Sequence, residues 1–255
     1  MRYIFLKACA KEPVFMNKLN DDVLGDKYRK VTGLNKDIFL KAKANLSKTF
    51  GFKLLATPTK HFPQKKFKGC YFVVRAVLGD SHVSMPSAAA HILLSLLLSH
   101  QQISSITNPH FRQAIQDEHC VALQGLLMVI MSIAYSSNHN SQSHKVSEAH
   151  LVQHLEKLDP GTSKSSRERT FGIGDWSAII DLFCKQHYLY KEKENHAEGE
   201  AAAVVLSLGP RGFLEVGRHQ IITFTHEAVG QTIDEALLAE IREEDENAEE
   251  DEDSV

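Results

Sequence analysis

The segment Gly172–Glu215, GIGDWSAIIDLFCKQHYLYKEKENHAEGEAAAVVLSLGPRGFLE, decides the fold of this 255-residue chain. Asp175 is a suitable N-cap, because its carboxylate accepts the free N–H groups at the start of a helix. Apolar residues then recur at helical spacing as far as Phe183, and a short extended run begins at Tyr188. A charged loop separates this run from the apolar stretch Ala203–Leu208. The order is therefore helix, strand, polar tip, strand.

The same order is found near the start of the chain. Asn35 is placed to cap a helix over Lys36–Phe50, and Gly51 occupies its C-cap position. The strand, tip and returning strand that follow are Phe52–Leu55, Thr57–Gly69 and Cys70–Leu78. The sequence thus predicts a mainly α fold with small β wings, built as two tandem winged-helix domains.

Four parts of the chain differ in composition. We predict a basic first winged helix over 1–79, an insert with the apolar helix Ser87–Ile103 over 80–121, a second winged helix with its C-terminal helix over 122–239, and a disordered acidic tail over 240–255. The further helices expected within the two domains are 2–10, 13–19, 123–135, 146–158 and a long helix over 211–230.

Composition favours an intracellular protein without catalytic chemistry. Hydrophobic residues make up 43% of the chain and charged residues 24%, and no apolar stretch approaches the roughly 20 residues of a membrane span. The four cysteines form no C-x-x-C pair, and no nucleotide-binding or hydrolase motif occurs. His150 and His154 have helical i, i+4 spacing, but no third ligand is evident. We therefore expect no enzyme activity, no catalytic residue, no cofactor, no metal and no membrane contact.

The charge is unevenly distributed. Residues 1–79 contain seventeen basic and five acidic residues, whereas residues 240–255 contain ten acidic residues and one basic residue. Lysine ammonium groups neutralise phosphates without reading the base sequence. An ordinary solvated face is the alternative interpretation. We hypothesise that the acidic tail competes with DNA for the basic half of the chain. The lysines predicted to contact double-stranded DNA lie on the first-half helix and on the tip that follows it: Lys36, Lys41, Lys43, Lys48, Lys60, Lys65, Lys66 and Lys68.

Several short motifs resemble those of the MAGE homology domain. In the second half these are Gly174-Asp175, Tyr188-Leu189, Gly209-Pro210-Arg211 and Leu214-Glu215. In the first half, YIFLK at 3–7 and FGFKL at 50–54 resemble the family's opening helix and its helix-to-strand junction. Within the family the chain looks most like the MAGE-type non-SMC subunits of the DNA-repair SMC complex.

This resemblance implies a nuclear, non-catalytic adaptor for DNA repair and recombination. The family's RING-type ligase subunit would dock on Ile4 and Phe5, which are equally suited to a plain core. A kleisin subunit would bind at four apolar residues: Phe183, Ile221, Ile222 and Phe224. In the alternative interpretation, these residues only hold the last helix to its own domain. The SMC heads would be contacted indirectly.

At the position where family members often contact DNA, this chain has different residues. Trp176-Ser177-Ala178 stands where family members carry lysines, so the DNA prediction moves to the first half. The rival interpretation is a MAGE-type regulator of a RING ubiquitin ligase that does not bind DNA. A sequence-specific transcription factor is disfavoured, because the first-half helix offers only Asn45 for reading base edges.

Overall fold

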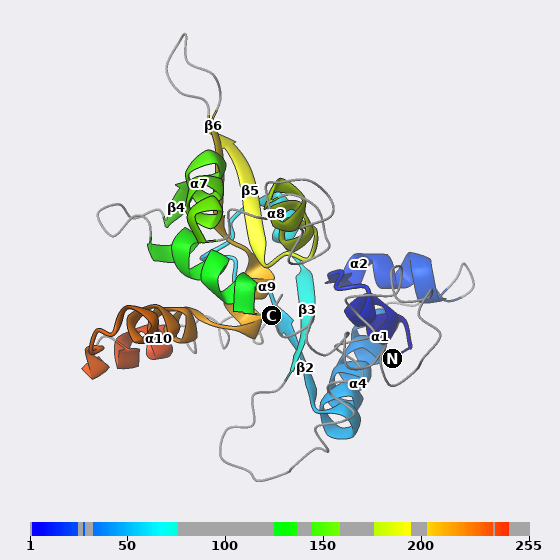
Figure 1. The fold of residues 1–255 in the computed structure, drawn as a ribbon. Helices are drawn as coiled ribbons and strands as arrows, with labels where there is room; N and C mark the ends of the chain where they lie inside the picture. The colour runs from blue at the N-terminus through cyan, green and yellow to red at the C-terminus, as the bar shows by residue number, and fades with distance from the viewer. Residues whose placement is uncertain are drawn as a thin grey trace, which may run out of the picture. The chain divides into compact units, whose positions relative to one another are not determined.

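The fold comes from a computed structural model that describes residues 2–24, 28, 33–75, 125–136, 144–158, 176–194, 203–236 and 238–244. Contacts divide the chain into two compact units, one comprising the chain up to Ser87 together with the chain from Ala239, the other the chain between them (Figure 1). The expected insert helix Ser87–Ile103 and the cap at Asp175 lie outside the described residues. The tail predicted as disordered over 240–255 is described only as far as residue 244, and residues 238–244 are helical, with Ile241 buried, so the start of the predicted tail is wrong.

The first unit combines short helices with a three-stranded antiparallel sheet of order β1-β3-β2. In this sheet Val14 pairs with Tyr71, and Leu54 pairs with Val73. The elements, coloured blue to cyan in Figure 1, are α1 (Arg2–Cys9), β1 (Val14–Phe15), α2 (Met16–Leu19), the π-helix η1 (Asn20–Leu24), α4 (Leu34–Phe50), β2 (Phe52–Ala56), the 3-10 turn η2 (Lys65–Phe67) and β3 (Cys70–Arg75).

One hydrophobic core joins the helices of the first unit to its sheet. Phe39, Ala42 and Leu46 recur on one face of α4 and are buried, and the rings of Phe39 and Tyr71 meet edge to face with their centroids 4.7 Å apart. Each fully buried large side chain contributes about 1.5–3 kcal/mol to folding. The buried members of the cluster are Ile4, Val14, Leu19, Phe39, Ala42, Leu46, Leu54 and Val73.

Two boundaries in the first unit differ from the prediction. Val14 and Phe15 form a strand rather than the start of a helix, because Lys11 turns the chain with φ 53° and Val14 then pairs with Tyr71. The helix α4 begins at Leu34, with Gly33 at its N-cap, so Asn35 lies inside the helix. Its Oδ1 accepts a hydrogen bond from the backbone N–H of Lys36 at 2.8 Å.

Gly51 ends α4 in a left-handed conformation, as predicted. Its φ is 67°, and its N–H donates to the carbonyl of Ser47 at 3.0 Å. We expect Gly51→Ala to destabilise the first unit by about 1–2 kcal/mol, because a Cβ disfavours this backbone conformation. Urea unfolding followed by far-UV circular dichroism measures the effect. Gly51→Asn is the matched variant and loses less, since asparagine tolerates positive φ; equal losses for both would contradict this account.

The second unit repeats the architecture with a sheet of order β4-β6-β5. Val146 pairs with Leu206 on one side of β6, and Leu189 pairs with Leu208 on the other. The elements are a helix over 125–136, β4 (Lys145–Ser147), α7 (Glu148–Leu158), α8 (Trp176–Lys185), β5 (Leu189–Glu194), β6 (Ala203–Leu208), α9 (Pro210–Glu215) and α10 (Arg218–Val229).

Two further differences from the prediction occur in this unit. Val146 belongs to β4 rather than to a helix, and α7 begins only at Glu148. The long helix expected over 211–230 is two helices, because Gly217 adopts φ 82° and interrupts it. The N–H groups of Val216 and Gly217 both donate to the carbonyl of Gly212, which closes α9 before α10 begins.

In the described residues, both units therefore share the order helix, short strand, further helices and a two-stranded wing that pairs with the short strand, and α9 and α10 follow the wing of the second unit. This arrangement is the winged helix, and the predicted mainly α fold with small wings is confirmed. Over the described parts of the chain, no helix is both long enough and apolar enough to cross a membrane.

Candidate nucleic-acid and partner interfaces

The tip of the first wing, Thr57–Gly69 between β2 and β3, is a folded turn. The carbonyl of Pro58 accepts hydrogen bonds from the N–H groups of His61 at 3.2 Å and Phe62 at 2.9 Å. Phe62 and Phe67 are buried beneath the tip and meet edge to face with their ring centroids 5.8 Å apart. This small apolar base fixes the backbone that presents the tip lysines.

All four predicted tip lysines, Lys60, Lys65, Lys66 and Lys68, are exposed. The ammonium of Lys66 lies 4.8 Å from the centroid of the Phe67 ring, a cation–π contact that draws its stem toward the wing. All four predicted lysines thus lie, exposed, within the single tip Thr57–Gly69.

The four predicted helix lysines lie on α4 as two pairs. Lys36 and Lys43 are seven residues apart on one stripe, and Lys41 and Lys48 form a second stripe. At 100° per residue the stripes are roughly 140° apart around the helix. Lys43 is half-buried and the other three are exposed. One flat face therefore cannot use both stripes equally.

The first wing and the second half of α4 are free of acidic residues. Between Asp37 and Asp80 the sequence contains eight lysines and one arginine, with no aspartate or glutamate. Opposite charges near a lysine would compete with phosphate for it. This stretch is therefore the strongest candidate for an anion-binding surface within the chain.

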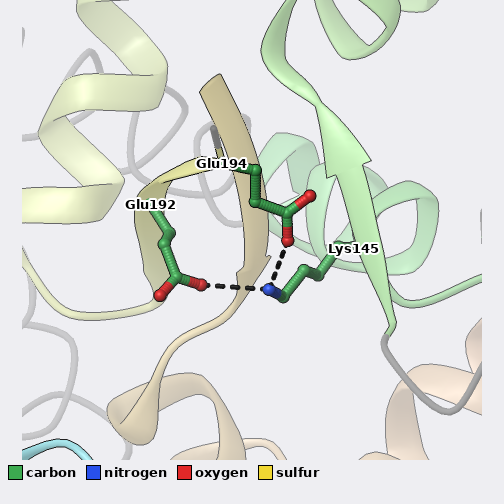
Figure 2. Close-up of polar contacts among 3 residues, drawn as sticks. All are labelled: Lys145, Glu192 and Glu194. Atoms are coloured by element: carbon green, nitrogen blue, oxygen red, sulfur yellow. Dashed lines mark hydrogen bonds and ion pairs between the residues drawn. The ribbon is translucent and has the colours of Figure 1, made fainter. Parts of the chain in front are cut away.

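The second wing has a different charge arrangement, in which ion pairs cross the sheet. The ammonium of Lys145 lies 3.0 Å from a carboxylate oxygen of Glu192 and 2.5 Å from one of Glu194 (Figure 2). Hydrogen bonds to Glu194 and Glu192 raise the pKa of Lys145. Lys191 likewise contacts Glu148 at 2.8 Å and Asp181 at 3.1 Å. These lysines are held by carboxylates of their own domain.

The start of α8 offers no cation either. Trp176 is only 3% exposed, and the exposed residues after it are Ser177 and Ala178. The tryptophan is thus a core residue of the second unit.

The predicted RING-docking pair is divided by the fold. Ile4 is 1% exposed and belongs to the core of the first unit. Phe5 is half-buried, with its ring centroid 5.6 Å from that of Phe50, and the neighbouring Leu6 is 58% exposed. On α1, Phe5 and Leu6 therefore present apolar surface, whereas Ile4 packs in the core and anchors the helix.

The predicted kleisin contacts are divided in the same way. Phe183 and Ile221 are 2% and 0% exposed, and Ile221 is the buried residue of α10. Ile222 and Phe224 are half-buried on the same helix. Only these last two present surface to a partner.

A cluster formed by the buried Tyr188 and Arg211 and the half-buried Glu215 was not anticipated. Arg211 is 5% exposed, and its Nε donates to Oε2 of Glu215 at 2.7 Å. The Tyr188 hydroxyl donates to the same oxygen at 2.8 Å, and burial followed by the charge of Glu215 raises the pKa of this tyrosine. The guanidinium also lies 5.4 Å from the Tyr188 ring centroid. The cluster joins α9 to the start of β5.

Two glycines allow this close packing. A Cβ on Gly209 would lie 2.4 Å from the carbonyl oxygen of His187, and one on Gly212 would lie 2.7 Å from that of Tyr188. The Gly-Pro-Arg and Leu-Glu motifs therefore have a structural role in this chain. Their sequence signal was visible, but only the fold reveals the burial of Arg211.

Comparison with known proteins agrees with this architecture. The MAGE homology domain family model matches residues 1–219. Among eleven matching chains of solved structures is one from an "Nse1-Nse3-Nse4 complex", with a TM-score of 0.60 and 16% sequence identity over 97% of this chain and 92% of that chain. No curated protein sequence matches.

The chain is thus a tandem winged-helix protein with one basic and one internally ion-paired wing. It belongs to the MAGE homology domain family.

Proposed function

We propose that the chain is the MAGE-type non-SMC subunit of a DNA-repair SMC complex. In this role it is a nuclear, non-catalytic adaptor that binds a RING-type ligase subunit, a kleisin and double-stranded DNA, and contacts the SMC heads indirectly. The similarity in fold to a chain of the three-subunit Nse1-Nse3-Nse4 complex supports the assignment. The proposed DNA binding is supported by the stretch between Asp37 and Asp80, which contains basic residues but no acidic ones and includes the folded first wing.

DNA contact of this kind depends on charge rather than on base sequence. The tip lysines are exposed and close together in the chain, and α4 adds Lys41 and Lys48 along one stripe. Each phosphate that is neutralised releases condensed counterions and contributes about 0.9 to the log-log salt slope. Between four and six contacts therefore give a slope of about 4 to 5.

Anisotropy of a labelled random duplex, titrated with the full chain across a salt series, tests this part. Binding with that slope and with no preference among duplex sequences is the expected result. The absence of binding at low salt would favour the second candidate, a regulator of a RING ubiquitin ligase that acts on proteins alone. Both candidates are members of the family, so family membership does not distinguish them and the binding experiment does.

The protein partners are assigned to the apolar side chains that keep some exposed surface. Phe5 on α1 would meet the RING-type subunit, supported from behind by the buried Ile4. Ile222 and Phe224 on α10 would meet the kleisin. The buried Phe183 and Ile221 would maintain the surface rather than touch the partner.

We expect Ile222→Glu with Phe224→Glu to abolish kleisin capture while the second unit stays folded. Both side chains are half-buried, so a carboxylate at either position remains hydrated. Ile221→Glu is the matched variant on the same helix: it buries a charge at a site with 0% exposure and unfolds the unit. Capture by the purified kleisin and the fluorescence of Trp176 are measured together. Normal capture of the kleisin by the double variant would show that α10 is not part of the kleisin-binding site.

A further inference from the structure

Two histidine side chains meet on the outer face of α7. His150 and His154 are one helical turn apart, and their Nε2 atoms lie 2.9 Å from each other with the rings inclined at 73°. His150 is exposed and His154 is half-buried. The pair is therefore accessible from solvent, with one nitrogen of each ring at hydrogen-bond distance from the other.

The backbone beneath the pair is well fixed. Leu151 and Leu155 on α7 are completely buried, which holds the histidine face outward. The N–H of His150 donates to the hydroxyl of Ser147 at 3.2 Å, a hydrogen bond that secures the first turn of the helix. The separation of the two imidazoles is thus set by the helix rather than by a loop.

This geometry suits a metal ion. Zinc binds imidazole nitrogen at about 2.0–2.1 Å, so two nitrogens on a tetrahedral ion are roughly 3.3 Å apart. The observed separation of 2.9 Å is about 0.4 Å shorter, so binding an ion requires the two rings to move slightly apart and to turn both nitrogens toward it.

We propose that His150 and His154 form a bidentate site for a divalent transition metal ion. Imidazole ligands select zinc, copper and nickel over magnesium and calcium. In the part of the chain that the structure describes, no group of three metal-ligating side chains gathers. The remaining positions on the ion are open to water or to a histidine, cysteine or carboxylate of a partner protein. The site needs neither DNA nor kleisin binding.

Calorimetric titration of the full chain with Zn²⁺ tests the proposal, with Mg²⁺ as the negative probe. We expect one binding event of 1:1 stoichiometry that His154→Gln weakens about 100-fold, because the second ligand no longer binds intramolecularly. His154→Gln combined with Glu156→His is the matched variant: it keeps all fourteen histidines but moves the second ring off the face of His150. It should also lose the site.

His219→Gln, on α10 in the same unit, serves as the control and should bind zinc as the natural chain does. Absence of zinc binding by the natural chain would overturn the proposal. Equal affinity of the natural chain and the two His154 variants would also overturn it, since the ion would then bind elsewhere. Unchanged Trp176 fluorescence in each variant shows that the second unit remains folded.

Discussion

The exchange of Lys60, Lys65 and Lys68 for glutamate is expected to weaken duplex DNA binding about 300-fold. A non-specific dissociation constant of about 10⁻⁵ M, divided equally among about six phosphate contacts, corresponds to roughly sevenfold per contact, and the reversed charges add repulsion. The salt slope should also fall by about 3. All three lysines are exposed on the tip, whereas Lys66 is left in place over Phe67. Anisotropy titrations across a salt series give both quantities.

The matched variant carries the same charge change on the second unit. Lys157, Lys185 and Lys193 are equally exposed, so their exchange for glutamate alters net charge identically without touching the first wing. If net charge alone governed binding, the two triple variants would weaken it equally. That outcome would contradict a binding surface on the first wing, whereas a large difference between them would support it.

The replacement of Arg211 by alanine is expected to destabilise the second unit by about 2–4 kcal/mol. The change leaves the Glu215 carboxylate without its guanidinium; breaking a fully buried pair costs about 3–5 kcal/mol, and the loss here is smaller because the Glu215 side chain is 28% exposed and keeps the Tyr188 hydroxyl as a partner. Trp176 is the only tryptophan, it is buried, and it lies in the second unit. Its fluorescence during urea unfolding therefore reports on that unit alone.

Two further variants sharpen this test. Arg211→Lys keeps the charge but cannot reproduce the planar donor geometry, so it should fall between the natural chain and Arg211→Ala. Arg211→Met with Glu215→Leu removes both charges and should recover part of the loss, because no unpaired ion remains. An unchanged unfolding midpoint in Arg211→Ala would show that the cluster contributes nothing to stability.

Patterns within a short stretch of sequence predicted the elements that depend on local chemistry. Gly51 was correctly identified as a helix C-cap, and both wings were found from apolar runs on either side of a polar tip. Val14 and Val146 were misassigned, since strands of two and three residues are too short to show alternation. Their conformation depends on partners far along the chain, Tyr71 and Leu206.

The candidate sites were harder to predict than the fold. Ile4 and Phe5 are adjacent apolar residues, and the sequence cannot tell which side of α1 faces the core; the fold buries the first and leaves the second half-buried. The same ambiguity affected Ile221 and Ile222. Arg211 is a further case, because an arginine is ordinarily a surface residue and its burial depends on Tyr188 and Glu215.

The small first strands also bear on how the domains fold. In each unit the wing hairpin pairs residues close in sequence, whereas the first strand joins it by pairing Val14 with Tyr71 or Val146 with Leu206. Closing such long loops costs chain entropy before any contact compensates for it. We expect each hairpin to form early and each first strand to dock last, so that the three-stranded sheet is completed only as the helices close over it.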